Sequence, residues 1–261
     1  GFKASYGRIP HPRAATSQTT SLGALTTTVA DAARHLDVSA GPDDRDRLSL
    51  PAPAVGYEDA VRTLDVRGLR AAWSPDLGFA AVDPEVRELT EAAAVTLMEA
   101  AGLEQIERPV QLTDPVRTWM SAGAVDMWLS LEEDMWPARA GDLMGFVRKP
   151  YEQTEDYPVR KFARSYKWRH RLEEEVAAVF ADVDVLLTPS TAVPAFPAAG
   201  PMPLVIDGRE VAPGMAVPFT MLANLCWNPA ASVPAGRNSE GLPVGLQIIG
   251  RRHADEVVLR L

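Results

Sequence analysis

The sequence predicts an α/β protein in which helices cover both faces of a β-sheet. Val183–Leu187 and Val244–Ile249 are short apolar runs, and each is stopped by a proline or a glycine, as buried strands are. Neither run alternates with polar residues, which is typical of strands covered by helices on each side. Pro229–Pro234 is bounded by prolines, so we expect a third extended piece there rather than a helix.

A β-α-β unit is predicted in the first half of the chain. Leu69–Ser74 has the pattern of a strand. Asp83 is expected to cap a helix with Pro84 in its first turn, and Gly102 is expected to end it. Leu103–Glu107 is then the next strand, and the two strands of such a unit are parallel. Because the unit lacks a glycine-rich phosphate loop, we expect it to be scaffold.

Three more helices follow from apolar residues at helical spacing. Thr26–Ala40 begins with threonines that can cap it and is stopped by Gly41 and Pro42. Trp119–Leu131 and the long Pro158–Phe180 are the other two. The inward face of the last helix is predicted to carry Phe162, Tyr166, His170, Val176 and Phe180.

Composition limits the classes of protein that fit. The chain has 261 residues, a net charge of -9 and a pI near 5.0, which argues against nucleic acid or an anionic membrane as a partner. We find no apolar run of about 18 residues and no signal-peptide pattern, so we expect a cytoplasmic location. The single cysteine, Cys226, excludes an internal disulfide framework and a cysteine-built zinc site.

Known catalytic patterns are missing from the chain. The sequence contains no serine-hydrolase elbow, no zinc-protease helix and no nucleotide-binding loop. The four histidines are far apart, so we expect no metal and no cofactor. Ser5 and Ser232 have no base close in sequence, and we expect their hydroxyls to bond to nearby backbone. Lys3 is assigned no catalytic role.

Several motifs together resemble the amidase signature family of amide hydrolases. They cover almost the whole chain and are specific as a set: Gly1-Phe-Lys-Ala-Ser-Tyr-Gly-Arg8, Asp184-Val-Leu-Leu-Thr-Pro189, Pro229-Ala-Ala-Ser-Val-Pro234 and Gly241-Leu-Pro-Val-Gly-Leu-Gln-Ile-Ile-Gly-Arg251. The resemblance implies one mixed sheet wrapped by helices. Residues 1–261 would be the C-terminal part of a single amidase signature domain. A helical insertion near the pocket, variable among family members, would span about 113–180.

The resemblance also exposes an absence. The family's catalytic groups are a Ser–Ser–Lys triad with a Gly/Ser-rich signature, and the chain has no Gly-Gly-Ser-Ser-Gly-like run. We therefore expect the triad to lie upstream and the chain alone to be inactive. The upstream half of the same protein would be a partner. Without that half, an uncovered sheet edge and apolar face would favour self-association.

Substrate-contacting residues are expected in two places. In the family, a small residue and then Gly more often stand where this chain has Cys226 and Trp227, followed by Asn228. Trp227 would place a large ring beside the substrate, or else fill a gap in the core. Trp119 and Trp128 lie in the variable segment and would line an apolar acyl site, or else belong to an ordinary helix core.

Three functions remain open from the sequence. The leading one is part of an amidase that hydrolyses the carbon–nitrogen amide bond of a small carboxamide. A second is an amidotransferase-type subunit of the same family, which works with a partner that binds tRNA. A third, from another class, is a non-catalytic binding or scaffold protein built on an amidase fold.

Overall fold

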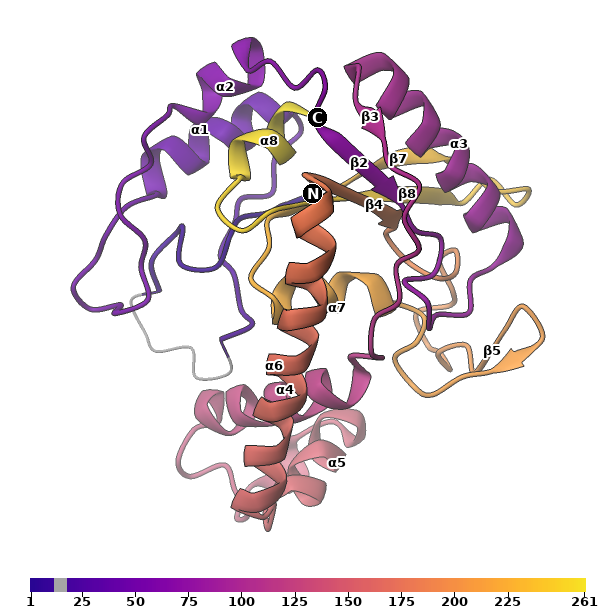
Figure 1. Ribbon diagram of the computed structural model, residues 1–261. Coiled ribbons are helices and arrows are strands. Elements are labelled where there is room, and N and C mark those ends of the chain that lie inside the picture. Colours follow the sequence, from indigo (N-terminus) through magenta and orange to yellow (C-terminus); the bar gives the residue numbers. More distant parts are fainter. Residues whose placement is uncertain (12–17) are drawn as a thin grey trace.

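A six-stranded mixed sheet forms the centre of the computed structural model, which describes residues 1–11 and 18–261 (Figure 1). The strand order is β1-β7-β8-β4-β2-β3, and a separate two-stranded sheet pairs β5 with β6. The strands are β1 (Phe2–Lys3), β2 (Arg70–Trp73), β3 (Glu104–Gln105), β4 (Val185–Pro189), β5 (Val205–Ile206), β6 (Arg209–Glu210), β7 (Ala230–Arg237) and β8 (Pro243–Gly250).

The sheet has a parallel side and an antiparallel side. β2 pairs in parallel with both β3 and β4, so the predicted β-α-β unit is confirmed. β4, β8, β7 and β1 then pair antiparallel in that order. The two apolar runs of the sequence become β4 and β8, neighbours near the middle of the sheet. This confirms the predicted fold class, a mixed sheet with helices packed on both faces.

The helices follow the local signals closely. Asp83 Oδ1 accepts hydrogen bonds from the first-turn amides of α3, and Gly102 ends that helix at φ +64°, where a side chain would add strain. Thr28 caps α1, which begins at Val29, three residues after the predicted start at Thr26. The helices are α1 (Val29–Ser39), α2 (Tyr57–Thr63), α3 (Pro84–Ala101), α4 (Val116–Ser130), the 3₁₀ turn η1 (Ala140–Asp142), α5 (Gly145–Thr154), α6 (Val159–Asp182), α7 (Pro218–Leu225) and α8 (Asp255–Arg260).

Each face of the sheet has its own core. On one face, the second half of α6 packs with α7 against β4 and β8; this core includes Leu172, Val176, Phe219, Leu222, Leu186 and Ile249. On the other face α3 packs against the same two strands; this core includes Ala94, Met98, Val185, Leu187 and Ile248. A third cluster joins α1, α2 and α8 around Leu36 and Tyr57.

A helical lobe extends away from the sheet. It consists of α4, α5 and the first half of α6, and it forms the lower part of Figure 1. These helices fall within the segment 113–180. The predicted inward face of α6 is wrong in its first half, where Ser165 and Arg169 are buried while Tyr166 and His170 are exposed. The reason is that the Arg169 guanidinium finds carbonyl partners inside the molecule, as described below.

Contacts between the two ends of the chain form a clasp, which we define as Ser5, Arg8, His253 and Asp255. The fully buried Asp255 carboxylate accepts the Ser5 amide at 2.7 Å and the Arg8 Nε–H at 3.4 Å. The amide of His253 donates to Ser5 Oγ at 2.9 Å. Together with the pairing of β1 and β7, the clasp fixes β1 at the edge of the sheet.

Candidate functional site

The loop between α7 and β7 has an unusual backbone at Trp227. Its φ is +66°, in the left-handed region that a large side chain enters rarely and at a cost of about 1–3 kcal/mol. Glycine enters this region freely. The sequence expectation that the family more often has glycine here therefore has a physical basis, because the turn itself favours glycine. Its occupation by tryptophan requires contacts that hold the ring in place.

Three contacts hold the Trp227 ring. It stacks on Tyr6, with ring centroids 4.6 Å apart and an interplanar angle of 13°. Its Nε1–H donates to the carbonyl of Gln18 at 2.6 Å. On α6, the Arg169 guanidinium carbon lies 5.6 Å from the ring centroid, which is the geometry of a cation–π contact. The ring is therefore fixed by segments from distant parts of the chain.

Arg169 is a buried cation that joins α6 to this loop. Its Nε–H lies 2.8 Å from the carbonyl of Leu225 and 3.1 Å from a carboxylate oxygen of Glu173. Its Nη2 donates to the same Gln18 carbonyl that Trp227 uses, at 3.1 Å. Asn224 adds a further tie, because its amide donates to the carbonyl of Thr19 at 2.7 Å. Side chains of α6 and α7 thus position the Gln18–Thr19 backbone against Trp227.

Cys226 and Asn228 flank Trp227 and point into the protein. The Cys226 thiol is buried in the core, and burial raises its pKa to about 12, which makes it a poor nucleophile near neutral pH. The buried Asn228 side-chain amide donates to the carbonyl of Gly250 at 2.8 Å. Both residues hold the loop, whereas the Trp227 ring stays half-buried at its surface.

The other two predicted site residues lie in different surroundings. Trp119 is half-buried and packs against the core that contains α6 and α7. Trp128 makes edge contacts with Trp136 and Tyr151, and its Nε1–H donates to Thr154 Oγ1 at 2.9 Å. Among the described side chains, no aromatic ring contacts both Trp128 and Trp227. Whether any of the five residues contacts substrate stays a prediction.

The predicted bonds of the two candidate nucleophiles to nearby backbone are wrong. Ser5 Oγ accepts the amide of His253 from the far end of the chain, and Ser232 bonds to a serine hydroxyl on another segment. Ser5 belongs to the clasp, and Ser232 Oγ lies 2.6 Å from Ser190 Oγ. In the contacts made by described residues, neither serine meets a lysine or histidine side chain that could act as a base. Lys3 donates to the carbonyl of Ala4 at 2.8 Å. Burial lowers the pKa of Lys3 to about 8, and the nearby Asp255 carboxylate opposes that shift.

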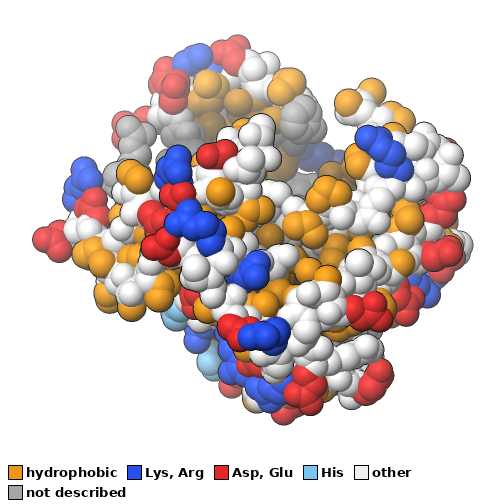
Figure 2. Space-filling view, turned by 90° about the horizontal axis from the view of Figure 1, so that it is seen from above, with side chains coloured by type: hydrophobic (Ala, Val, Ile, Leu, Met, Phe, Trp, Pro, Cys, Tyr) orange, Lys and Arg blue, Asp and Glu red, His pale blue; other side chains and the backbone are white. Residues whose placement is uncertain are grey.

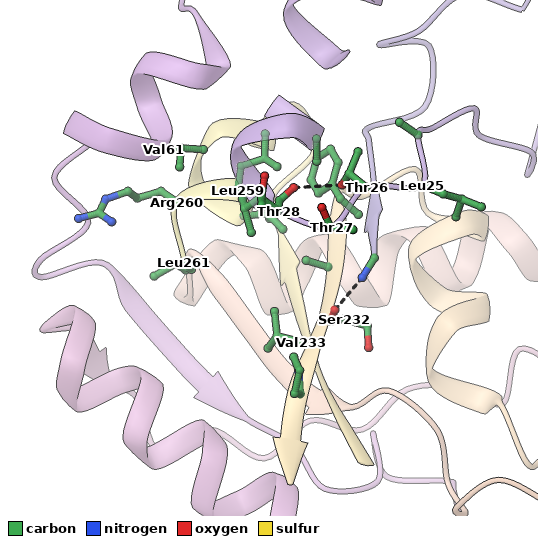
Figure 3. Close-up of a pocket in the computed structure, with 18 residues that line it drawn as sticks. Leu25, Thr26, Thr27, Thr28, Val61, Ser232, Val233, Leu259, Arg260 and Leu261 are labelled. Carbon is green, nitrogen blue, oxygen red and sulfur yellow. Dashed lines mark hydrogen bonds between the residues drawn. The ribbon is translucent and has the colours of Figure 1, made fainter. Parts of the chain in front are cut away.

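A broad apolar trough lies beside the sheet edge at β1 (Figure 3). Its volume is about 780 Å³, and it is bordered by the 24–29 segment, strands β1 and β7, and the end of α8. Leu25 is fully exposed at its border. Seen from above, hydrophobic side chains are exposed across the middle of the molecule, between its groups of helices (Figure 2). The trough and the Trp227 ring are separate features, because Trp227 does not line the trough.

Residues 1–11 and 18–261 contain neither a candidate metal site nor a candidate membrane-spanning helix. No cluster of three or more His, Cys, Asp and Glu side chains there could hold a metal ion. No helix there has both the length and the apolar character that crossing a bilayer requires.

Sequence reasoning missed Tyr6, Gln18 and Arg169. Tyr6 was noted only as part of the Gly1–Arg8 motif and Arg169 was given no role, and nothing in the sequence pairs either of them with Trp227. The one available signal was Trp227 itself, a bulky residue where the resembling family more often has glycine. Such a replacement predicts a ring that needs supporting neighbours, although it does not say which ones.

Comparison with known proteins gives the class of this fold. The structure of this chain matches that of a bacterial aryl acylamidase of the amidase signature enzymes, with a TM-score of 0.84 and 28% identity. The match covers all of this chain and 56% of the acylamidase. A glutamyl-tRNA(Gln) amidotransferase subunit from Thermotoga maritima matches with a TM-score of 0.68 and 26% identity, again over 56% of its length. Both solved structures therefore continue well beyond the part that this chain matches.

The sequence comparison agrees with the structural one. An acylamidase from Rhodococcus erythropolis is 34% identical over 248 residues, which are 91% of this chain and 50% of the relative. A glutamyl-tRNA(Gln) amidotransferase subunit from Chloroflexus aggregans is 29% identical over 57% of its length. The Amidase family model matches residues 1–259. The chain belongs to the amidase family, and it spans about half the length of the curated relatives it matches.

Proposed function

We propose that this chain forms the sheet and one pocket wall of an enzyme that hydrolyses the carbon–nitrogen bond of a small carboxamide. The observation that carries the proposal is the likeness of the whole chain to an aryl acylamidase, at a TM-score of 0.84 and 28% identity. The similarity to an acylamidase at 34% identity supports the same substrate class. An aryl amide of a short carboxylic acid is therefore the first substrate to test.

The chemistry in this proposal is that of the amidase signature family. A neutral lysine takes the proton of a serine through a second serine, and the first serine attacks the amide carbonyl. Backbone N–H groups stabilise the oxyanion. The carbon–nitrogen bond breaks as the amine takes up the proton, and water then hydrolyses the acyl-serine ester. We assign the triad to the part of the relatives' length that this chain does not match.

Trp227 has a specific role in this proposal. Its ring is half-buried, its backbone is strained, and Tyr6 and Arg169 hold it from two sides. Strained residues held by their surroundings cluster at binding sites. We assign the ring to the wall that limits the length of the acyl group. The Tyr6 stack keeps it from rotating away when substrate binds.

The apolar trough is proposed to receive the remainder of the enzyme. Its border is apolar, β1 forms one edge of the sheet there, and the exposed Leu25 offers a side chain for a partner surface. An open strand edge beside exposed apolar surface commonly pairs with another segment. Binding at the trough would bring the triad near β1, the strand that the clasp fixes.

Activity measurements with and without the remainder of the parent enzyme test the proposal. We expect no hydrolysis of an aryl amide by the chain alone above a buffer blank, and turnover when the remainder is added in trans. Leu25→Glu, at the border of the trough, should weaken the restoration of activity by the added remainder. Val38→Glu, at an exposed site on α1, should not. The proposed placement of the triad outside this chain would be overturned if the chain alone hydrolysed the aryl amide and Ser5→Ala or Ser232→Ala abolished that activity.

The role of Trp227 is tested in the full-length parent enzyme. Trp227→Gly should raise kcat/KM for long acyl groups relative to short ones by about tenfold, the discrimination that a pocket wall commonly gives per methylene. Trp168→Ala, a change at an exposed tryptophan on α6 with no assigned role in the site, serves as the control and should leave this ratio unchanged. Equal specificity constants for the parent and Trp227→Gly across the acyl series would show that Trp227 fills a gap in the core.

A second candidate function rests on a specific observation. Several glutamyl-tRNA(Gln) amidotransferase subunits match the chain from end to end at 27–30% identity, among them those of Chloroflexus aggregans and Geobacter metallireducens. The higher TM-score of the aryl acylamidase favours hydrolysis of a small amide. Amide-nitrogen transfer from glutamine by the full-length enzyme, without turnover of aryl amides, would favour the amidotransferase instead.

A further inference from the structure

The first half of α6 concentrates positive charge in an acidic protein. The chain carries a net charge of -9, yet the stretch 160–171 contains no aspartate or glutamate. The stretch contains six basic residues besides His170: Arg160, Lys161, Arg164, Lys167, Arg169 and Arg171. Such a run usually belongs to a solvated face, so its arrangement in the structure decides whether it means more.

Four of these cations form one stripe on the helix surface. Arg160, Arg164, Lys167 and Arg171 follow the i, i+4, i+7, i+11 spacing of a single helical face, and all four are exposed. The buried Arg169 lies on the opposite face. At a rise of about 1.5 Å per residue, the stripe is about 16 Å long. We call these four residues the cation stripe.

The cation stripe opposes the stability of its own helix. The first turn of α6 contains no acidic residue, although the helix N-terminus carries a partial positive charge that repels cations. Like charges at i, i+4, such as Arg160 and Arg164, repel each other as well. Arg171 pairs with Glu175, but within the described residues Arg160, Arg164 and Lys167 form no ion pair. Within the described residues, three of the four cations of the stripe therefore lack a counter-charge.

The layout of the stripe favours a protein partner over a lipid surface. A helix that lies in a membrane interface presents an apolar centre flanked by cations. Here the cations occupy the centre of the exposed face, and the partly exposed rings of Tyr166 and Trp168 lie to its sides. A row of carboxylates with matching spacing is the better complement.

A matching row exists on α3 of this same chain. Glu88, Glu91 and Glu99 are exposed on the outer side of α3, with the exposed Val95 between them. The first and last of positions 88, 91, 95 and 99 are eleven positions apart, as are the first and last residues of the cation stripe. Among the described residues, these three glutamates form no ion pair. In one molecule α3 lies at the upper right of Figure 1 and the stripe in the lower lobe, so the two rows do not meet.

We propose that the cation stripe binds the α3 glutamate row of a second copy of this chain. With the two helices antiparallel, Arg160 faces Glu99, Lys167 faces Glu91 and Arg171 faces Glu88 of the other copy. The stem of Arg164 then covers Val95, as long basic side chains commonly cover apolar surface. The contact joins different surfaces of the two copies, and it is independent of the proposed catalytic function.

Salt distinguishes this contact from association through the apolar trough. The Debye length is about 8 Å at 0.15 M salt and about 3 Å at 1 M, so exposed ion pairs weaken as salt rises. Burial of apolar surface does not weaken in this way. Analytical ultracentrifugation should therefore show a mass above that of the monomer at low salt, and monomer at about 1 M salt.

Charge reversal tests which residues carry the contact. Arg160→Glu with Lys167→Glu should leave a monomer at low salt, and both changes favour the α6 helix, so a loss of folding cannot explain the result. Arg209→Glu with Arg252→Glu makes the same charge change at exposed sites elsewhere and should leave association intact. Adding Glu91→Lys and Glu99→Lys to the Arg160→Glu, Lys167→Glu chain should restore association. The charges of both rows are then reversed, so they attract each other again.

Three results would overturn the proposal. The first is a monomer at every concentration and at low salt. The second is association that persists at high salt or in the Arg160→Glu, Lys167→Glu variant, which would assign it to the trough. The third is failure of the doubly reversed chain to associate while the Arg209→Glu, Arg252→Glu control does.

Discussion

The aromatic group around Trp227 and the one around Trp128 differ in how they are held. Trp128 meets Trp136 and Tyr151 edge to face and donates to a neighbouring helix side chain, all within the helical lobe. Trp227 has a left-handed backbone, stacks on a residue from the other end of the chain, and contacts a buried arginine. The first group packs edge to face on unstrained backbone, whereas the second holds one ring in a strained position.

This difference suggests how to tell a positioned ring from core filling. A ring that fills a gap contributes mainly through the apolar area it buries. A positioned ring is opposed by backbone strain and held by polar and charged contacts. Substitutions in the two groups should therefore affect different properties: stability for Trp128, and conformation and substrate preference for Trp227.

The largest stability effect is expected in the Trp128 group. Trp128→Ala should lower the free energy of unfolding by about 2–3 kcal/mol, somewhat less than for a fully buried tryptophan. Urea denaturation followed by circular dichroism measures the change. A loss comparable to that of an exposed residue, below about 0.5 kcal/mol, would contradict the packing role of Trp128.

A smaller effect is expected for Arg169. Arg169→Met should cost about 1–2 kcal/mol, because the buried carbonyls of Gln18 and Leu225 lose a donor. Arg169→Lys should restore little of it, since an ammonium lacks the forked donors of a guanidinium. Both variants should change the near-ultraviolet circular dichroism, which reports the packing of the Trp227 ring. An unchanged spectrum would mean that the Tyr6 stack and the Gln18 hydrogen bond hold the ring without Arg169.

The smallest effect separates backbone from side chain at Trp227. Trp227→Gly should be more stable than Trp227→Ala by about 1 kcal/mol, because alanine keeps the cost of a left-handed backbone and glycine removes it. At most positions the order is reversed, since glycine loses more conformational entropy on folding. Equal stability of the two variants, or a more stable alanine, would show that the loop relaxes once the ring is removed.

The sequence predicted the parts of the fold that depend on local signals. Asp83, Pro84 and Gly102 define the ends of α3 because capping and a left-handed stop act within a few residues. The apolar runs of β4 and β8 were predicted as buried strands for a similar reason, since the sheet needs uninterrupted apolar residues there. Neither the residues nor the family resemblance predicted which strands they would pair with.

The candidate site depended on contacts that no local pattern encodes. Tyr6 and Trp227 stack although 221 positions separate them, and periodicity carries no information about such a pair. On α6, hydrophobic spacing predicted Tyr166 and His170 inside. The structure buries Arg169 instead, because carbonyls at the end of α7 and at Gln18 offer it hydrogen bonds. A polar residue with buried partners overrides the apolar pattern.

The clasp between Ser5 and Asp255 bears on the timing of folding during synthesis. β1 leaves the ribosome more than 220 residues before its partner strand β7 and the buried Asp255. Contacts so distant in sequence form slowly, because a long loop must close before they add stability. Until then Phe2 and its neighbours keep an unpaired strand edge beside exposed apolar surface. The nascent chain therefore has a long interval in which a chaperone that covers this edge would improve the yield of folded protein.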